Sequence, residues 1–96
     1  MSNIRCKIVD MSTPAFIRAH QYSSWHRKGI ENSETCGCFY CLAIFKPLEI
    51  QEWVDEYNGI GQTALCPKCG IDSVIGSHNG FPISVEFLKK MKQYWF

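Results

Sequence analysis

The sequence predicts a small α+β domain organised around a metal site, and three observations predict it. Two Cys-x2-Cys pairs occur in the chain, with residues 42–65 between them. Short apolar runs next to these pairs suit strands, whereas segments that open with proline or serine suit helices. The 96 residues, 46% of them hydrophobic, allow one modest core. We therefore expect a single domain over residues 1–96, with residues 1–12 as a loosely attached N-terminal segment.

Each cysteine pair has the spacing of a metal-binding knuckle. The first knuckle is Cys38-Phe-Tyr-Cys41, and the second is Cys66-Pro-Lys-Cys69, followed by Gly70. Two intervening residues let a tight turn aim both sulfurs at one ion, and Zn²⁺ prefers four such ligands in a tetrahedron. The predicted fold is thus a zinc ribbon of two knuckles and short antiparallel strands. Its predicted Zn²⁺ ligands are Cys38, Cys41, Cys66 and Cys69.

A ligand set of four cysteine thiolates indicates a structural rather than a catalytic ion. They occupy every tetrahedral position and leave none for the water that a catalytic zinc activates. Iron in a rubredoxin-like site is the competing interpretation, because Cys-Pro-Lys-Cys-Gly also suits that fold. Zinc is favoured, since no matching glycine follows Cys41. Buried thiols or disulfides are the remaining alternative, and disulfides are rare in a reducing cytosol.

An N-terminal helix is expected before the ribbon. Thr13 can cap a helix in which Pro14 takes the first position, and Gly29 can end it after Lys28. Residues 4–9 alternate in polarity and predict a short strand.

A second helix is expected between the knuckles, from Pro47 to Asn58-Gly59. Its predicted apolar face consists of residues at i, i+3, i+4 and i+7, and it places Trp53 in the core. These residues are Ile50, Trp53, Val54 and Tyr57. Residues 42–45 predict a short strand, and residues 63–65 and 71–75 predict a hairpin that carries the second knuckle at its tip.

A C-terminal helix is expected to begin after Ser84, which can cap it, and to run nearly to the end of the chain. Leu88, Met91 and Trp95 form its apolar stripe, and we expect the final aromatic residues 94–96 to pack in the core.

Charge and cysteine content limit the function classes. The formal net charge is +1; four thiolates and one Zn²⁺ add −2, so the metal-bound chain would carry −1. This near-neutral balance does not indicate a general nucleic-acid binder. No run approaches the roughly 18 apolar residues that span a bilayer, so we expect no membrane association and a cytoplasmic location. In that compartment six cysteines indicate metal or reactive thiols.

Two further groups of residues could carry chemistry. Cys36 lies two residues before the first knuckle and is a candidate reactive thiol that could also exchange into the metal shell. The segment after Ala19 concentrates donor and titratable groups and forms a candidate binding surface. Its residues are His20, Tyr22, His26 and Arg27.

Several stretches of this sequence resemble a known group of proteins. They are residues 36–41 (Cys-Gly-Cys-Phe-Tyr-Cys), 47–53, 63–76 and 87–96, together with the His-x5-His segment from His20 to His26. Their combination is similar to small bacterial and phage zinc-ribbon proteins known only as cytoplasmic proteins of unknown function. The resemblance implies the four metal ligands, the helix positions and a cytosolic location, and it implies no activity.

The function predicted from the sequence is that of a zinc-stabilised binding module. Rigid knuckle loops beside a polar helix suit recognition of a macromolecule, and the near-neutral charge favours a protein over a nucleic acid. The alternative is a nuclease or nucleotide-acting hydrolase that uses His20, His26 and Arg27, with zinc only structural. Thiol redox chemistry at Cys36 and Cys38 is a third hypothesis. Whether the protein is an enzyme is left open by the sequence.

Overall fold

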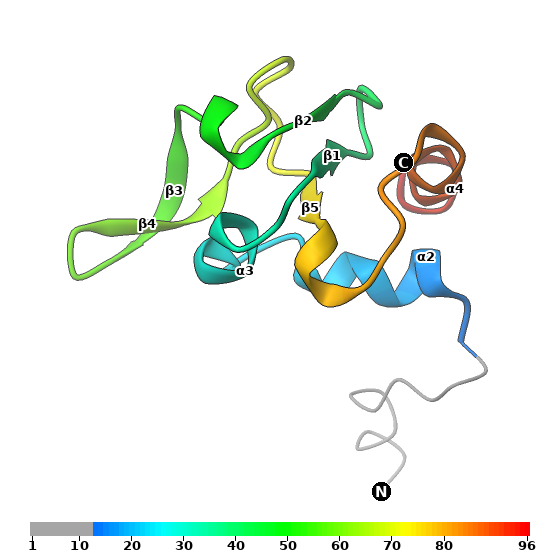
Figure 1. Cartoon of the computed structure of the whole chain (residues 1–96), viewed down its shortest axis with the longest axis horizontal. Helices are drawn as coiled ribbons and strands as arrows, with labels where there is room; N and C mark the ends of the chain where they lie inside the picture. The colour runs from blue at the N-terminus through cyan, green and yellow to red at the C-terminus, as the bar shows by residue number, and fades with distance from the viewer. Residues whose placement is uncertain (1–12) are drawn as a thin grey trace, which may run out of the picture.

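The computed structural model describes residues 13–96, so the strand predicted over residues 4–9 and the segment 1–12 lie outside the described residues. Figure 1 shows an α+β arrangement in which short strands lie between a hairpin on one side and helices on the other. No helix within residues 13–96 is long and apolar enough to span a membrane.

A small central sheet joins the two halves of the chain. Strand β1 (Cys36–Cys38) lies between β2 (Ile44–Phe45) and β5 (Val74–Gly76), antiparallel to both. Cys36 is opposite Phe45 on one side and opposite Gly76 on the other. This pairing brings the residues that follow the second knuckle next to the strand that leads into the first.

The two faces of this sheet pack against different elements, because side chains alternate along each strand. On one face Cys36, Cys38 and Val74 join a buried cluster with Ile30 and Phe45. The other face carries Ile75, which packs with residues of the helices α2 (Ala15–Arg18) and α4 (Val85–Trp95), of the 3-10 turn η1 (Ala19–Tyr22) and of the turn between β1 and β2. That second cluster comprises Ala19, Phe39, Ile75, Phe87, Leu88 and Met91.

The predicted C-terminal helix is confirmed as α4. Ser84 is its N-cap, and the Ser84 hydroxyl accepts a hydrogen bond from the Phe87 backbone N–H at 3.2 Å. Leu88 and Met91 are fully buried. The expectation that residues 94–96 are core was wrong, because Tyr94 and Phe96 are 56% and 63% exposed. They lie at the end of the helix, beyond the turn that contacts the sheet.

The predicted N-terminal helix is not continuous. The segment forms α2, a 3-10 turn η1 (Ala19–Tyr22) and, after a break, α3 (Arg27–Glu31). Trp25 lies in the break with a positive φ of 49°. The reason is tertiary: the backbone N–H groups of Trp25 and His26 bond to Thr63 Oγ1 and Gln62 O at 2.8 Å each, and a continuous helix would turn them inward.

The helix predicted from Pro47 to Asn58 was wrong. Only the 3-10 turn η2 (Pro47–Glu49) is helical, and a hairpin of β3 (Trp53–Tyr57) and β4 (Ile60–Ala64) follows it. Asn58 and Gly59 both have positive φ, 53° and 78°, as a two-residue hairpin turn of this type requires. The β3–β4 hairpin projects from the rest of the molecule (Figure 1). Trp53 is therefore a strand residue and only partly buried.

The hairpin predicted around the second knuckle was also wrong in its pairing. Residues 63–64 belong to β4 and pair with β3, while β5 pairs with β1. The first knuckle is the one at a hairpin tip, between β1 and β2, where the Cys38 backbone N–H bonds to Ala43 O at 2.9 Å.

Candidate metal centre

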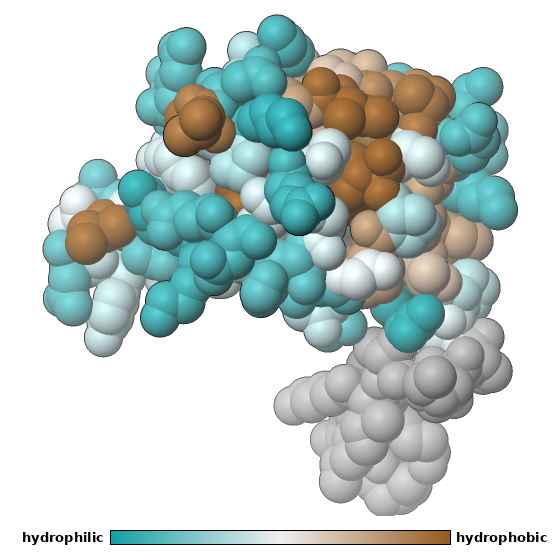
Figure 2. All heavy atoms as spheres, viewed as in Figure 1, coloured by the Kyte–Doolittle hydropathy of each residue, from teal (hydrophilic) through white to brown (hydrophobic). Residues whose placement is uncertain are grey.

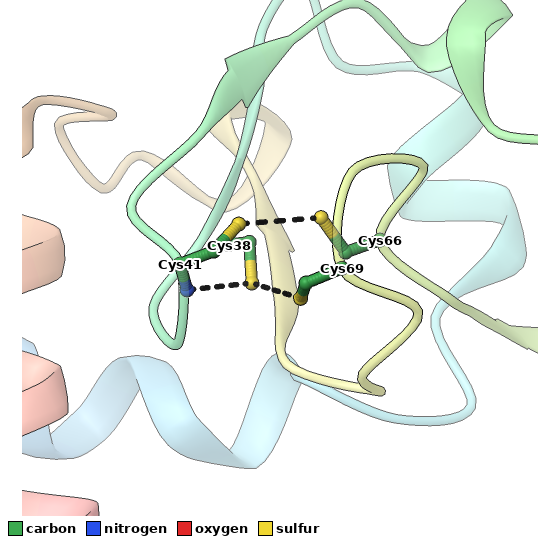
Figure 3. Close-up of side chains that lie close together, drawn as sticks. All are labelled: Cys38, Cys41, Cys66 and Cys69. Atoms are coloured by element: carbon green, nitrogen blue, oxygen red, sulfur yellow. Dashed lines mark hydrogen bonds between the residues drawn. The ribbon is translucent and has the colours of Figure 1, made fainter.

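The four knuckle cysteines converge on one point. One sulfur from each of Cys38, Cys41, Cys66 and Cys69 lies within 4.8 Å of every other. Figure 3 shows the two knuckles facing each other across a short gap, with all four side chains directed into it. The four cysteines predicted from spacing are thus brought together, and the cluster could hold a metal ion.

The distances between sulfurs suit a small tetrahedral ion. A tetrahedron with metal–sulfur bonds of about 2.3 Å has edges of about 3.8 Å. The separation between Cys38 Sγ and Cys69 Sγ is 3.6 Å, and that between Cys41 Sγ and Cys66 Sγ is 3.7 Å. These sulfurs are too far apart for a disulfide, whose bond is about 2.05 Å.

Backbone donors surround the sulfurs in the same way in both knuckles. In the first, the Tyr40 N–H donates to Cys38 Sγ at 3.3 Å; in the second, the Lys68 N–H donates to Cys66 Sγ at 3.3 Å. The Cys41 N–H also donates to Cys38 Sγ, at 3.4 Å. Such N–H···S contacts favour the thiolate form, which is the form that binds a metal.

Ser73 completes the surroundings of Cys38. Its hydroxyl lies 3.0 Å from Cys38 Sγ, and both residues are buried. Burial alone would raise the pKa of Cys38, but the contacts from Ser73 and from the Cys41 and Tyr40 N–H groups outweigh it and lower that pKa. Burial, with the neighbouring Cys38, raises the pKa of Cys69. The arrangement therefore favours Cys38 as the first thiolate, and an ion would draw the proton from the others.

Ser73 was not predicted from the sequence as a site residue. It is 35 residues from Cys38, and only the β1–β5 pairing brings them together. One sequence feature could have indicated Ser73: it lies four residues after Cys69, within residues 71–75, which were already predicted to form a strand.

Cys36 does not lie in the metal cluster. It is fully buried in the core on β1, and burial raises the pKa of its thiol to about 12. A thiol in this form and position is a weak nucleophile. The structure thus supports a packing role for Cys36 rather than a reactive one.

His26 is built into the fold. It is 9% exposed, its Nδ1 lies 2.6 Å from Tyr22 O, and its Nε2 lies 3.1 Å from the Ala64 N–H. These contacts require Nδ1 to donate and Nε2 to accept, which is the neutral imidazole. Burial lowers the pKa of His26 in agreement with that form. The ring thereby links the N-terminal segment to β4, two residues before Cys66.

Arg27 also makes structural contacts. Its Nη1 donates to Gly61 O at 2.7 Å, its Nε bonds to Glu31 at 3.0 Å, and its guanidinium carbon is 4.3 Å from the centre of the Trp53 ring. The contacts with Gly61 and Trp53 hold α3 against the hairpin, whereas the ion pair with Glu31 lies within α3.

His20 and Tyr22 face different surroundings from these two residues. The His20 ring stacks on Trp95 with 3.8 Å between ring centres, and Tyr22 packs against Phe81 at 5.7 Å. His20 lines one surface hollow and His26 another, and Arg27 lines neither. The structure thus gives the proposed hydrolase residues His20, His26 and Arg27 no common pocket among these hollows.

The fold and the site together define a class: a small α+β domain with a four-cysteine cluster that could bind a metal ion. Comparison with models of protein families, with curated proteins and with solved structures gave no match.

Proposed function

We propose that the protein is a zinc-stabilised module that binds another protein through an aromatic surface next to the metal centre. Zinc is the proposed ion because four thiolates in a closed tetrahedron are the usual ligand set of structural zinc. The first knuckle also has Leu42 where the second has Gly70, which departs from the two-glycine pattern of a rubredoxin-like iron site.

The main support for protein binding is a group of exposed aromatic side chains, which we call the aromatic surface. Tyr40 comes from the first knuckle, and the others come from the end of α4. Their exposed fractions are 40% for Tyr40, 56% for Tyr94, 37% for Trp95 and 63% for Phe96. Side chains of these types dominate the energetics of protein interfaces.

Ring contacts fix the aromatic surface to the metal-bearing loop. Phe96 lies 5.0 Å from Tyr40 and 5.7 Å from buried Phe39, measured between ring centres. Trp95 stacks on His20 at 3.8 Å, and Tyr94 contacts Trp95 at 4.9 Å. A surface held in this way loses little side-chain entropy when a partner binds, which favours affinity. Zinc would add to this effect by fixing the loop that carries Phe39 and Tyr40.

Charge next to the aromatic surface supports a partner segment that combines acidic and large apolar residues. Lys89, Lys90 and Lys92 lie on α4, where Glu86 is the one acid. The Lys92 ammonium lies 5.0 Å from the centre of the Tyr40 ring. Figure 2 shows apolar side chains gathered over the region of α4 and the adjoining strand, while the side of the hairpin is largely hydrophilic.

The test is selection of peptides from a random displayed library on the immobilised, zinc-loaded protein. We expect the selected peptides to carry aspartate or glutamate beside aromatic or leucine residues. A Tyr94→Ser, Phe96→Ser double variant should lose at least about tenfold in affinity for them, since such anchors contribute most of an interface's binding energy. Val85→Ser is the matched control, because Val85 is an exposed apolar residue at the other end of the same helix.

Two outcomes would contradict the proposal. One is unchanged binding by the double variant while its zinc content and melting temperature match those of the wild type. The other is tighter binding of labelled single-stranded oligonucleotides than of any selected peptide, because aromatic side chains beside lysines can also stack with bases.

A further inference from the structure

One side-chain nitrogen of Arg18, Nε, is buried and unpaired in the part of the chain that the structure describes. The Arg18 guanidinium lies over the Phe81 ring, with 5.9 Å between the guanidinium carbon and the ring centre. A buried donor without a partner costs about 1–3 kcal/mol, so native proteins rarely retain one without a reason.

A surface hollow of about 310 Å³ opens beside Arg18. It lies between the N-terminal segment α2–η1 and the turn after η3 (Ser77–Asn79), and it is separate from both the metal centre and the aromatic surface. Its lining residues are Ala15, Arg18, Gln21, Tyr22, Asn79, Gly80, Phe81 and Pro82.

The lining of the hollow has the chemistry of an oxyanion site. Arg18 is its one charged residue, and no aspartate or glutamate lies among the lining residues. Gln21, Tyr22 and Asn79 add neutral donors around it. Arginine presents a planar set of N–H groups that matches the oxygens of phosphate and carboxylate, and pairs of this kind are among the stronger hydrogen bonds in proteins.

We propose that this hollow binds a phosphate or carboxylate group carried on a planar ring, with the oxyanion on Arg18 and the ring against Phe81 and Tyr22. The volume exceeds what the oxyanion alone fills, and the two ring side chains, with 5.7 Å between their centres, form an apolar wall for the remainder. The oxyanion would bond to the Nη groups of Arg18, because Nε is shielded from solvent and cannot be reached from the hollow. This site shares no residue with the aromatic surface and does not depend on the proposed protein partner.

The experiment uses the full-length zinc-loaded protein and four probes: phenyl phosphate, benzoate, inorganic phosphate and phenol. Binding is followed by NMR chemical-shift changes of backbone amides at fixed ionic strength. We expect phenyl phosphate or benzoate to bind with saturation and to shift the amides of Arg18, Tyr22, Asn79 and Phe81. Inorganic phosphate should bind more weakly and phenol not at all. The ratio between phenyl phosphate and benzoate identifies which oxyanion the site prefers.

Three variants locate the site. Arg18→Gln should weaken binding at least about tenfold, because it removes the charge and the paired donors, and Arg18→Lys should restore only part of it. Lys89→Gln removes the same charge from an exposed position on α4. If the effect of Arg18→Gln is local, Lys89→Gln should change the affinity of the hollow for the probes less than about twofold. Tyr22→Phe keeps the ring and removes one donor, so a smaller loss is expected.

The inference would be overturned if the chemical-shift changes did not saturate with phenyl phosphate or benzoate at millimolar concentrations. So would equal losses in Arg18→Gln and Lys89→Gln, which would indicate a general charge effect. Should Arg18→Gln fail to fold, shifts confined to the amides lining the hollow in the wild type, reduced in Asn79→Ala, would support the site, and their absence would reject it.

Discussion

Leu42 and Gly70 occupy equivalent positions, each directly after the second cysteine of its knuckle, and both have positive φ, 68° and 80°. Each donates its backbone N–H to the carbonyl oxygen of the first cysteine of its knuckle, at 2.8 Å for Leu42 and 2.9 Å for Gly70. The two knuckles therefore share one backbone conformation, although only the second has the residue that adopts it without strain. Leu42 is retained in this conformation while it packs against the cluster that contains Phe39 and Leu88.

A pair of substitutions tests this difference. Gly70→Ala should destabilise the zinc-loaded protein by about 1–2 kcal/mol through left-handed strain. No steric clash adds to this cost, because within residues 13–96 no atom beyond the chain neighbours lies within 4 Å of the added Cβ. Leu42→Gly should change stability by less than about 1 kcal/mol, since relief of strain offsets the lost apolar contact. Urea unfolding at fixed free zinc measures both. A Gly70→Ala protein as stable as the wild type would show that the knuckle can adopt another conformation.

His26 should make stability depend on pH. Burial lowers its pKa below the usual 6.5, so the unfolded chain binds the proton more readily than the folded one. The stability that this residue contributes is thus fully present above about pH 6.5 and is lost as pH falls below that value. His26→Gln keeps an acceptor for the Ala64 N–H and removes the titration, so its stability should decline less between pH 6.5 and 5.5. Unfolding curves of both proteins at saturating zinc measure this; identical slopes would contradict the assigned neutral ring.

The removal of the His26 side chain should be costly. His26→Ala leaves the buried Ala64 N–H and the partly buried Tyr22 carbonyl oxygen without their ring partners, and a loss of about 2–4 kcal/mol follows from two such groups. A decrease in the free energy of unfolding below about 1 kcal/mol, measured by thermal or urea unfolding, would contradict the structural role of His26 and favour a functional one.

Arg27 and Trp53 should be energetically coupled. The guanidinium lies 4.3 Å from the ring centre, and the Arg27 side chain is 30% exposed. A double-mutant cycle with Arg27→Met and Trp53→Leu should give a coupling of about 1 kcal/mol, within the range for partly exposed cation–π pairs. A coupling near zero would mean that Arg27 stabilises the hairpin only through Gly61.

Cys36 should be inert in the folded protein. Its full burial and a pKa of about 12 predict no modification by iodoacetamide at pH 8 while the zinc-loaded protein stays folded. The same thiol should react after denaturation, which serves as the control and is read by mass spectrometry of peptides. Rapid native labelling of Cys36 would revive the redox hypothesis.

The sequence predicted those features that short-range chemistry determines. The spacing within each knuckle was enough to predict Cys38, Cys41, Cys66 and Cys69 as a cluster, and Ser84 was enough to place the start of α4. The two cysteines of each knuckle, and likewise Ser84 and the Phe87 N–H that it caps, lie within one turn of each other, so a local pattern contains the needed information.

The sequence misled where local signals competed or where partners are distant. Ile50, Trp53, Val54 and Tyr57 have helical spacing, yet Asn58-Gly59 is also a strong hairpin signal, and the hairpin formed. The break in the N-terminal helix depends on hydrogen bonds from the backbone N–H groups of Trp25 and His26 to β4, more than 35 residues away. No local pattern reports such contacts, and for the same reason the structural role of His26 and the contribution of Ser73 were missed.

The central claim is a single zinc ion held by four cysteines, and native mass spectrometry tests it most directly. Protein purified without chelators, with Zn²⁺ and Fe²⁺ both present in the growth medium, should weigh one zinc more in the native than in the denatured state. Cys66→Ser should lose the ion and most of its folded structure, because metal binding to such a site is coupled to folding, whereas the matched Cys36→Ser should keep one zinc. A native mass without metal, a mass increment of iron, or full zinc occupancy in Cys66→Ser would contradict the account.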